Sequence, residues 1–334
     1  MPNNKKEKIL GVGSPIVDIL VSTTDSFIAE NISGDKGGME LVDITVINSI
    51  LSKITSEEKI VPGGSAANTI EALSKLGIST GFLGKIADDK LGRFYKEHYR
   101  EIGCDISRFK ISEEVETGRC LSLVTPDSER TMRTFLGAAA TIRLEDISID
   151  DFKGYTHLHI EGYMLHNHAV VKKVLKLAKS LSLTVSLDLA SFEVVKLNME
   201  ILPELLKSYI DIVFCNEDEA MQYCDSNDPK DILSALDGIC DIVALKLGKA
   251  GSIIKTSTEQ VCIKAEIVDA VDTTGAGDLW QAGFLYEYIN SRQLSGKLLE
   301  KAGGFGSLLG AEIVKIKGAS IPEDRWDYIR SKLN

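Results

Sequence analysis

Short apolar runs alternate with amphipathic segments through the second half of the chain. Four apolar runs have the length of buried strands: 156–161, 183–188, 211–215 and 242–247. Segments with a helical spacing of apolar residues lie between or beside them, at 167–181, 192–207, 217–223 and 229–239. Alternation of strands and helices is typical of a parallel sheet that helices cover on both faces. The pattern therefore predicts an α/β protein.

The first half of the chain mixes the two patterns. We predict strands at 8–14, 17–22 and 80–86, and helices at 43–54, 65–76 and 89–102. Ser65 follows a Pro-Gly-Gly turn and is expected to cap the second of these helices, which ends at Gly77. Two strand-like runs around a turn predict a β-hairpin, at 119–125 and 130–136. The closing elements are expected to be a hairpin at 252–256 and 260–264 and helices at 277–292 and 297–314.

Composition and charge exclude several classes of protein. The 334 residues are 44% hydrophobic and 26% charged, as in soluble globular proteins. No apolar run reaches the ~18 residues of a membrane-spanning helix, and no secretory leader is expected at the polar start. The formal charge of −11 disfavours binding to nucleic acid or anionic lipid. The six cysteines match no metal motif, so we expect free thiols and a cytoplasmic location.

The strongest chemical signal is the loop at 269–278, which reads DAVDTTGAGD and precedes a helical pattern. Its two glycines let backbone N–H groups approach an anion, and the dipole of the helix adds positive potential. Asp278 is either a helix N-cap or a general base that takes a proton from a hydroxyl held against the anion. Other nucleotide motifs are incomplete: Ile16 replaces the third glycine of a dinucleotide fingerprint, and Lys249 lacks the rest of a P-loop.

Three motifs in a fixed order form a specific set. GGSAAN at 63–68 precedes an early helix, NEDE at 216–219 follows a central strand, and GAGD at 275–278 precedes a late helix. Together they resemble the ribokinase-like (PfkB-type) family of carbohydrate and nucleoside kinases, over nearly the whole chain. Within that family, KGGM at 36–39 and the segment 117–139 resemble adenosine kinases.

The resemblance implies a ribokinase-like three-layer αβα sandwich with a mostly parallel central sheet and a small β-sheet lid. The large domain is expected at 1–15, 41–103 and 138–334, and the discontinuous lid at 16–40 and 104–137. Closure of such a lid over the substrate would exclude water and limit wasteful hydrolysis of ATP. Both a monomer and a homodimer are compatible with the resemblance.

The resemblance also implies which residues bind the substrate. Asp18 and Asn68 are implied to hold sugar hydroxyls, because a carboxylate accepts from two vicinal hydroxyls and a carboxamide both donates and accepts. Gly63 and Gly64 would let the sugar approach the backbone. Ser14 is implied beside the nucleoside, where eukaryotic adenosine kinases carry Asn. The residues expected near the base are Met39, Phe135 and Tyr163.

Catalysis is implied at the loop before the late helix and on the lid. Asp278 resembles the base of the family for the 5′-hydroxyl. The implied anion hole consists of Gly275, Ala276 and Gly277. Arg130 matches a lid arginine that could swing in and neutralise phosphoryl charge, and Arg133 is a weaker candidate for that role.

ATP and metal ions are implied at further positions. Asn216 and Glu219 are implied to organise Mg²⁺ near the ATP phosphates, largely through water. The residues implied to lie beneath ATP are Lys246, Gly248, Gly251 and Thr273. Asp272 and Thr274 resemble part of a loop that binds a monovalent cation such as K⁺ in several relatives.

These residues predict an ATP-dependent nucleoside kinase. It would transfer the γ-phosphoryl of MgATP to the 5′-hydroxyl of adenosine or a related purine nucleoside, giving AMP and ADP. A ribokinase- or fructokinase-like sugar kinase stays open, because Ser14 replaces the expected Asn. A non-catalytic sensor of nucleosides or nucleotides is a remote alternative, which the retention of Asp278 argues against.

Overall fold

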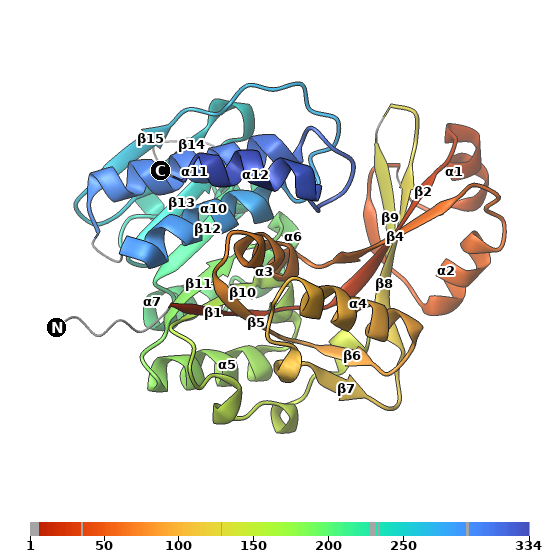
Figure 1. Ribbon diagram of the computed structural model, residues 1–334, viewed down its shortest axis with the longest axis horizontal. Coiled ribbons are helices and arrows are strands. Elements are labelled where there is room, and N and C mark those ends of the chain that lie inside the picture. Colours follow the sequence, from red (N-terminus) through yellow and green to blue (C-terminus); the bar gives the residue numbers. More distant parts are fainter. Residues whose placement is uncertain are drawn as a thin grey trace.

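The computed structural model describes residues 7–34, 36–127, 129–226, 232, 234–291 and 294–333. Its main feature is a sheet of eight strands in the order β15-β14-β13-β12-β11-β10-β1-β5 (Figure 1). These strands span Lys8–Val12 (β1), Ser79–Leu83 (β5), His157–Glu161 (β10), Thr184–Asp188 (β11), Ile212–Asn216 (β12), Ile242–Lys246 (β13), Ser252–Lys255 (β14) and Gln260–Ile263 (β15). The six from β5 to β13 pair in parallel, and β14 and β15 add an antiparallel hairpin at one edge. The predicted mostly parallel sheet is confirmed.

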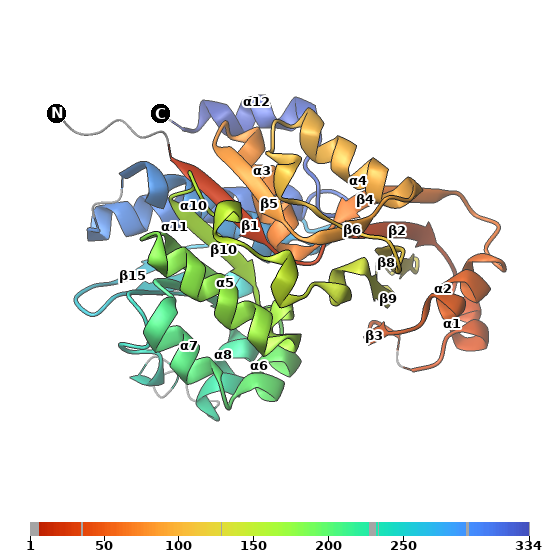
Figure 2. The same cartoon turned by 90° about the horizontal axis from the view of Figure 1, so that it is seen from below.

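Helices cover both faces of this sheet, which makes three layers (Figure 2). On one face lie α3 (Ser65–Lys75), α10 (Ala276–Ser291), α11 (Gly296–Ile313) and α12 (Glu323–Ser331); on the other lie α5 (His168–Ser180), α6 (Phe192–Asn198), α7 (Leu202–Tyr209) and α8 (Glu217–Cys224). The strands are apolar on both sides, since Phe214 belongs to the first core and its neighbour Cys215 to the second. The helix α4 (Lys90–Glu101) extends the first layer beside β5.

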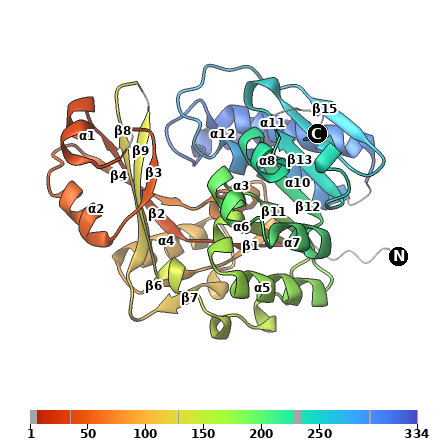
Figure 3. The ribbon, with the colours of Figure 1, turned by 180° about the vertical axis from the view of Figure 1, so that it is seen from behind.

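A second sheet stands beside the large one, on the side of its carboxyl strand ends (Figures 1 and 3). Its order is β3-β9-β8-β2-β4. The strands span Ile16–Ser22 (β2), Met39–Leu41 (β3), Glu58–Gly63 (β4), Thr117–Val124 (β8) and Arg130–Gly137 (β9). The predicted hairpin is confirmed as the antiparallel pair β8 and β9.

The two faces of the second sheet differ in what they meet. On one face, alternate apolar residues such as Ile19 and Leu121 form a small core with α1 (Asp25–Asn31) and α2 (Ile44–Leu51). The other face carries Asp18 and Arg130 toward the large sheet. Because side chains alternate along a strand, neighbouring residues of β2 and β9 serve different purposes.

Several elements differ from the sequence-based expectations. β4 and α2 belong with the second sheet, although we expected residues from 41 onward in the large unit. In the opposite sense, β7 (Lys110–Ser112) pairs with β6 (Lys85–Ala87), away from the second sheet. The segment 192–207 forms two helices, and 80–86 divides between β5 and β6. The predicted helix at 229–239 lies partly outside the described residues, because 229–231 and 233 are not among them.

No helix among the described residues is both long enough and apolar enough to cross a lipid bilayer.

Candidate active site

Asp278 lies where the two sheets meet and is held by α3. It is the third residue of α10, and its carboxylate accepts hydrogen bonds from Asn68 Nδ2 at 2.8 Å and from Ser65 Oγ at 2.7 Å. Burial and the neighbouring Asp188 raise the pKa of Asp278 to about 6. The N-cap interpretation is therefore wrong for Asp278, because its carboxylate bonds to another helix. The expected cap role of Ser65 is also wrong, since Gly64 occupies that position and the Ser65 hydroxyl reaches Asp278.

The loop before α10 offers backbone donors to an anion. Gly275 has φ +74°, a left-handed conformation that favours glycine, and a Cβ there would lie 2.9 Å from Ala319 Cβ. The Ala276 N–H donates to Thr273 O at 3.2 Å. The next two N–H groups, of Gly277 and Asp278, belong to the first helical turn and precede any acceptor that the helix could provide. With the helix dipole behind them, they form an anion site of the predicted kind.

Four residues predicted to bind the substrate gather beside Asp278. The Asp18 carboxylate lies over Gly63, 2.6 Å from where a Cβ would stand, so a side chain at Gly63 would displace it. Gly64 has φ +105° and faces the Ser14 carbonyl, which leaves no room for a Cβ. Burial raises the pKa of Asp18 to about 6; the charge of Arg130 lowers it and that of Asp278 raises it.

Glu161 is a buried carboxylate that sequence reasoning missed. At the end of β10 it accepts from the Ser14 N–H at 2.7 Å and from the Ala66 N–H at 2.9 Å. Burial raises its pKa to about 7, although both N–H groups lower it. Glu161 thus joins the loop after β1, which leads into the strand of Asp18, to the start of α3, the helix of Asn68. It stands in an apolar run, and nothing in its local pattern marks it.

Lys246 and Asp188 form an ion pair next to the anion site. Lys246 Nζ lies 3.1 Å from Asp188 Oδ1, and the side chains are 15% and 7% exposed. A Cβ on Gly277 would lie 3.2 Å from the same Nζ, so the ammonium sits against the first turn of α10. Lys246 was predicted beneath ATP, whereas Asp188, at the end of β11, was missed because it closes an ordinary apolar strand.

Asn216 and Glu219 come together as a capping box at the start of α8. Asn216 Oδ1 accepts from the Glu219 N–H at 2.9 Å, and the Glu219 carboxylate accepts from the Asn216 side chain and backbone, both at 2.8 Å. Burial, followed by the charge of Asp188, raises the pKa of Glu219 to about 7. In the part of the chain that is described, no three His, Cys, Asp or Glu side chains cluster as metal ligands. This sparse set fits a magnesium ion that arrives with ATP and keeps most of its waters.

Arg130 connects the second sheet to the loop before α10. Its Nε donates to Ser122 Oγ at 2.7 Å, and its guanidinium donates to the Thr274 hydroxyl and lies 3.8 Å from Asp272 Oδ2. Asp272 also accepts from the N–H groups of Thr274 and Gly318, both at 2.9 Å. The residues predicted to form a cation loop thus receive N–H and O–H donors and face an arginine.

Arg133 lies on the opposite face of the same strand. It is 2% exposed, 3.3 Å from Glu40 Oε2, and donates to Met132 O at 2.8 Å. Sheet alternation directs it toward the segment at 33–40 and away from Asp278. Its candidacy for neutralising phosphoryl charge is therefore corrected.

The residues predicted near the base have different surroundings. Phe135 packs against the core beneath α1 and α2, on the face of β9 that points away from Asp18, so that prediction is corrected. Met39, 47% exposed on the edge strand β3, pairs with Met132 and so lies on the face of the sheet that carries Arg130. Tyr163 is 38% exposed in the turn after β10, where burial, followed by charges that include Asp278, raises its pKa. The face of β9 that carries Arg130 also carries Met132, which the sequence analysis did not single out.

Two other predicted positions are shaped by the backbone. Gly248 and Gly251 have φ values of +53° and +98° in the turn between β13 and β14. At Gly251, the Ile263 carbonyl leaves no space for a Cβ, so the turn itself requires glycine. A contact of either glycine with ATP stays a prediction.

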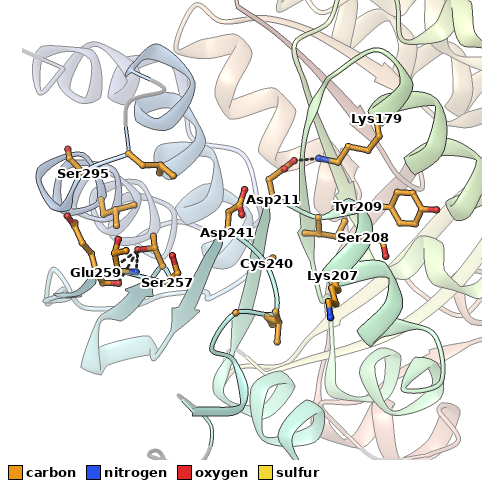
Figure 4. Close-up of a pocket in the computed structure, with 17 residues that line it drawn as sticks. Lys179, Lys207, Ser208, Tyr209, Asp211, Cys240, Asp241, Ser257, Glu259 and Ser295 are labelled. Carbon is orange, nitrogen blue, oxygen red and sulfur yellow. Dashed lines mark hydrogen bonds and ion pairs between the residues drawn. The ribbon is translucent and has the colours of Figure 1, made fainter.

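A different cavity lies at the opposite, amino ends of β12 and β13 (Figure 4). It measures about 600 Å³ and contains an ion pair between Lys179 Nζ and Asp211 Oδ2, at 2.5 Å. None of the predicted site residues lines it. The histidines at 157 and 159 do not line this cavity, and both bond to Ser186 Oγ inside the sheet.

Known proteins resemble this chain in both sequence and structure. A model of the pfkB family of carbohydrate kinases matches residues 42–326. The crystal structure of an adenosine kinase from Sinorhizobium meliloti superposes with a TM-score of 0.87 and 29% sequence identity. The superposition covers 98% of this chain and 100% of the adenosine kinase. A probable sugar kinase from Rhizobium etli gives 0.87 and 28%, covering 98% and 99%. An aminoimidazole riboside kinase of Salmonella typhimurium is 25% identical over 265 residues, 77% of this chain and 83% of its own.

The fold is thus ribokinase-like, as the three motifs predicted, and the match covers both sheets. The chain belongs to the pfkB family of carbohydrate kinases.

Proposed function

We propose that the protein is an ATP-dependent nucleoside kinase that phosphorylates the 5′-hydroxyl of adenosine or a related purine nucleoside. The observation that carries the proposal is Asp278, a partly buried carboxylate at the first turn of α10, with Asp18, Asn68 and the Gly275 loop around it. The likeness to an adenosine kinase over the whole chain supports the nucleoside as acceptor.

The proposed reaction assigns each group a task. Asp18 and the free Oδ1 of Asn68 hold the hydroxyls of the sugar, which brings the 5′-hydroxyl to Asp278. The Asp278 carboxylate takes the hydroxyl proton as the 5′-oxygen bonds to the γ-phosphorus, and the bond to ADP breaks. The N–H groups of Gly277 and Asp278 and the Arg130 guanidinium offset the charge of the phosphoryl group.

Magnesium would be held near Glu219 through water and would neutralise charge on the ATP phosphates. The capping box leaves Asn216 little freedom, so its part is to fix the orientation of Glu219. Asp272 and Thr274 are the groups of the loop that would take part in a monovalent cation site. We expect the second sheet to act as a lid, with Arg130 as its contact to the loop.

A sugar kinase is the second candidate, and two observations favour it. Ser14, whose Oγ lies 3.8 Å from Met164 Sδ, stands where the resemblance implies an Asn in eukaryotic adenosine kinases. Phe135, the aromatic predicted for the base, faces the other way. A sugar without a base would need neither residue.

A substrate panel tests the proposal. Production of ADP is coupled to an indicator reaction with adenosine, inosine, guanosine, ribose and fructose as acceptors, with and without K⁺. We expect adenosine or another purine nucleoside to give the highest kcat/KM. Higher kcat/KM with ribose or fructose would replace the proposal by the sugar kinase, and binding without turnover of any acceptor would favour the sensor.

We also propose a cytoplasmic location. All six cysteines are free, which is compatible with a reducing compartment.

A further inference from the structure

The ion pair between Asp188 and Lys246 has two further carboxylates near it, those of Glu219 and Asp278. The Lys246 ammonium lies 3.1 Å from Asp188 Oδ1. The positive charge of Lys246 also lowers the pKa values of Glu219 and Asp278. Three carboxylates therefore share one buried cation. Such an excess of negative charge costs stability, which is typical of functional sites.

The position of the ammonium is set by Gly277 and the end of β11. At Gly277, Lys246 Nζ occupies the space beside the helix turn, so any side chain at 277 would meet it. Asp188 ends β11, and two residues later Ala190 has φ +70°, which residues other than glycine rarely adopt.

The same ammonium lies where the transferred group would bind. The N–H groups of Gly277 and Asp278 point away from the helix beside it, and Ser65 connects the two carboxylates, donating to Asp278 at 2.7 Å and lying 3.4 Å from Asp188 Oδ2. A phosphoryl group at the helix end would therefore have a fixed positive charge at its side.

We infer that Asp188 is a positioning residue that holds the Lys246 ammonium against the first turn of α10, where this ammonium neutralises charge on the transferring phosphoryl group. The inference rests on the proposed kinase function and adds a cation to it. The reaction itself is unchanged. The bond from the γ-phosphorus to ADP breaks, a bond from the γ-phosphorus to the acceptor oxygen forms, and the proton of the acceptor hydroxyl goes to Asp278. Lys246 keeps its three protons throughout.

The test compares Lys246→Met, Lys246→Arg, Asp188→Asn and the double variant Lys246→Met/Asp188→Asn. Removing a preorganised charge of this kind costs about 10²–10³ in kcat, so we expect that loss in Lys246→Met and partial recovery in Lys246→Arg. Asp188→Asn should lose about tenfold, by the loss of one orienting charge. Because Asp188 acts through Lys246, the double variant should be no slower than Lys246→Met alone.

The pH profile of kcat/KM provides a readout that a merely structural pair would not move. The charged or titratable groups that face Asp278 are Asp18, Glu161, Tyr163, Asp188 and Lys246. Removing the cation should raise the pKa of Asp278 and shift the acid limb to higher pH in Lys246→Met. Removing the anion in Asp188→Asn should shift it to lower pH.

Lys179→Met is the matched control, since it removes the lysine of the other ion pair, at the amino end of the sheet. It should keep kcat and the acid limb. An active wild type with full kcat in Lys246→Met, or strictly multiplicative losses in the double variant, would overturn the inference and leave the proposed function standing. A wild type that phosphorylates no acceptor would overturn the proposed function itself.

Discussion

The two ends of the large sheet each hold a lysine–aspartate pair, but the surroundings of the pairs differ. At the amino end, Lys179 and Asp211 are 29% and 21% exposed, and the Val185 N–H donates to the same carboxylate at 2.5 Å (Figure 4). At the carboxyl end, Lys246 and Asp188 are only 15% and 7% exposed and stand near two further carboxylates. The first arrangement satisfies its own charges, whereas the second concentrates like charges where an anion would bind. That difference favours the carboxyl end of the sheet as the place of the proposed phosphoryl transfer.

The largest expected effect is at the base. Asp278→Asn keeps the shape of the side chain but cannot take a proton, so kcat should fall by about 10²–10⁴ while the acceptor still binds. Steady-state kinetics and calorimetric binding of adenosine measure the two properties. Asp211→Asn is the control at the amino end and should change the unfolding midpoint more than kcat. Unchanged turnover in Asp278→Asn would show that Asp278 is not the base. The functional difference between the amino and carboxyl ends of the large sheet would then have no support.

The next effect concerns the acceptor. Asp18→Asn replaces a carboxylate that accepts from two hydroxyls, and hydrogen bonds to charged groups contribute about 1.5–3 kcal/mol. The KM for the acceptor should therefore rise by about 10–150-fold, with little change in the KM for ATP. Kinetics with each substrate varied in turn separate the two constants. An equal rise in both would show that Asp18 supports the closed arrangement of the sheets and does not bind the acceptor.

A smaller effect distinguishes the two arginines of β9. Arg130→Ala should lower kcat by about tenfold with little change in the unfolding temperature, because Arg130 contacts the loop before α10. Arg133→Ala should do the reverse and destabilise the protein by about 1–3 kcal/mol, since it removes hydrogen bonds of a buried guanidinium. Activity assays and thermal denaturation of both variants test this. Equal loss of activity in the two would contradict the assignment of the two faces.

The smallest effect is a pH dependence of opposite sign for activity and stability. Burial raises the pKa values of Asp18 and Asp278 to about 6 and those of Glu161 and Glu219 to about 7. Each is an acid that binds protons more tightly when folded, so its contribution to stability is present below about pH 4 and is lost as the pH rises through 6 to 7. Activity needs Asp278 ionised and should fall below about pH 6.

Chemical denaturation between about pH 5 and pH 7.5 measures how the free energy of unfolding depends on pH. The free energy of unfolding should decline with rising pH less steeply in Asp18→Asn/Asp278→Asn than in the wild type. A steeper decline in the double variant would mean that these carboxyls do not have raised pKa values.

The sequence predicted the large sheet well because its strands carry their own signal. The runs around Phe214 and Leu245 are apolar on both sides, and the glycines at 275 and 277 mark a helix start. Local patterns could not predict β4, since its polar first half is matched to β2 by pairing alone. The same holds for α12, whose burial depends on Trp326 and Ile329.

The candidate site divides in the same way. Asp278, Asp18 and Asn68 stand in motifs and come together as expected. Glu161 and Asp188 end apolar strands that look ordinary, and their importance comes from Ser14 and Ser65, which lie 147 and 123 residues away in the sequence. The direction of Phe135 depends on the register between β8 and β9, which a one-residue shift would have reversed.

The most direct test of the central claim is to identify the phosphorylated product. The purified protein is incubated with MgATP and adenosine, and phosphorus NMR of the mixture shows where the phosphoryl group goes. The account predicts AMP, with the phosphate on the 5′-oxygen, formed in step with ADP and lost in Asp278→Asn. ADP with inorganic phosphate and no AMP, in a protein that phosphorylates a free sugar instead, would contradict it.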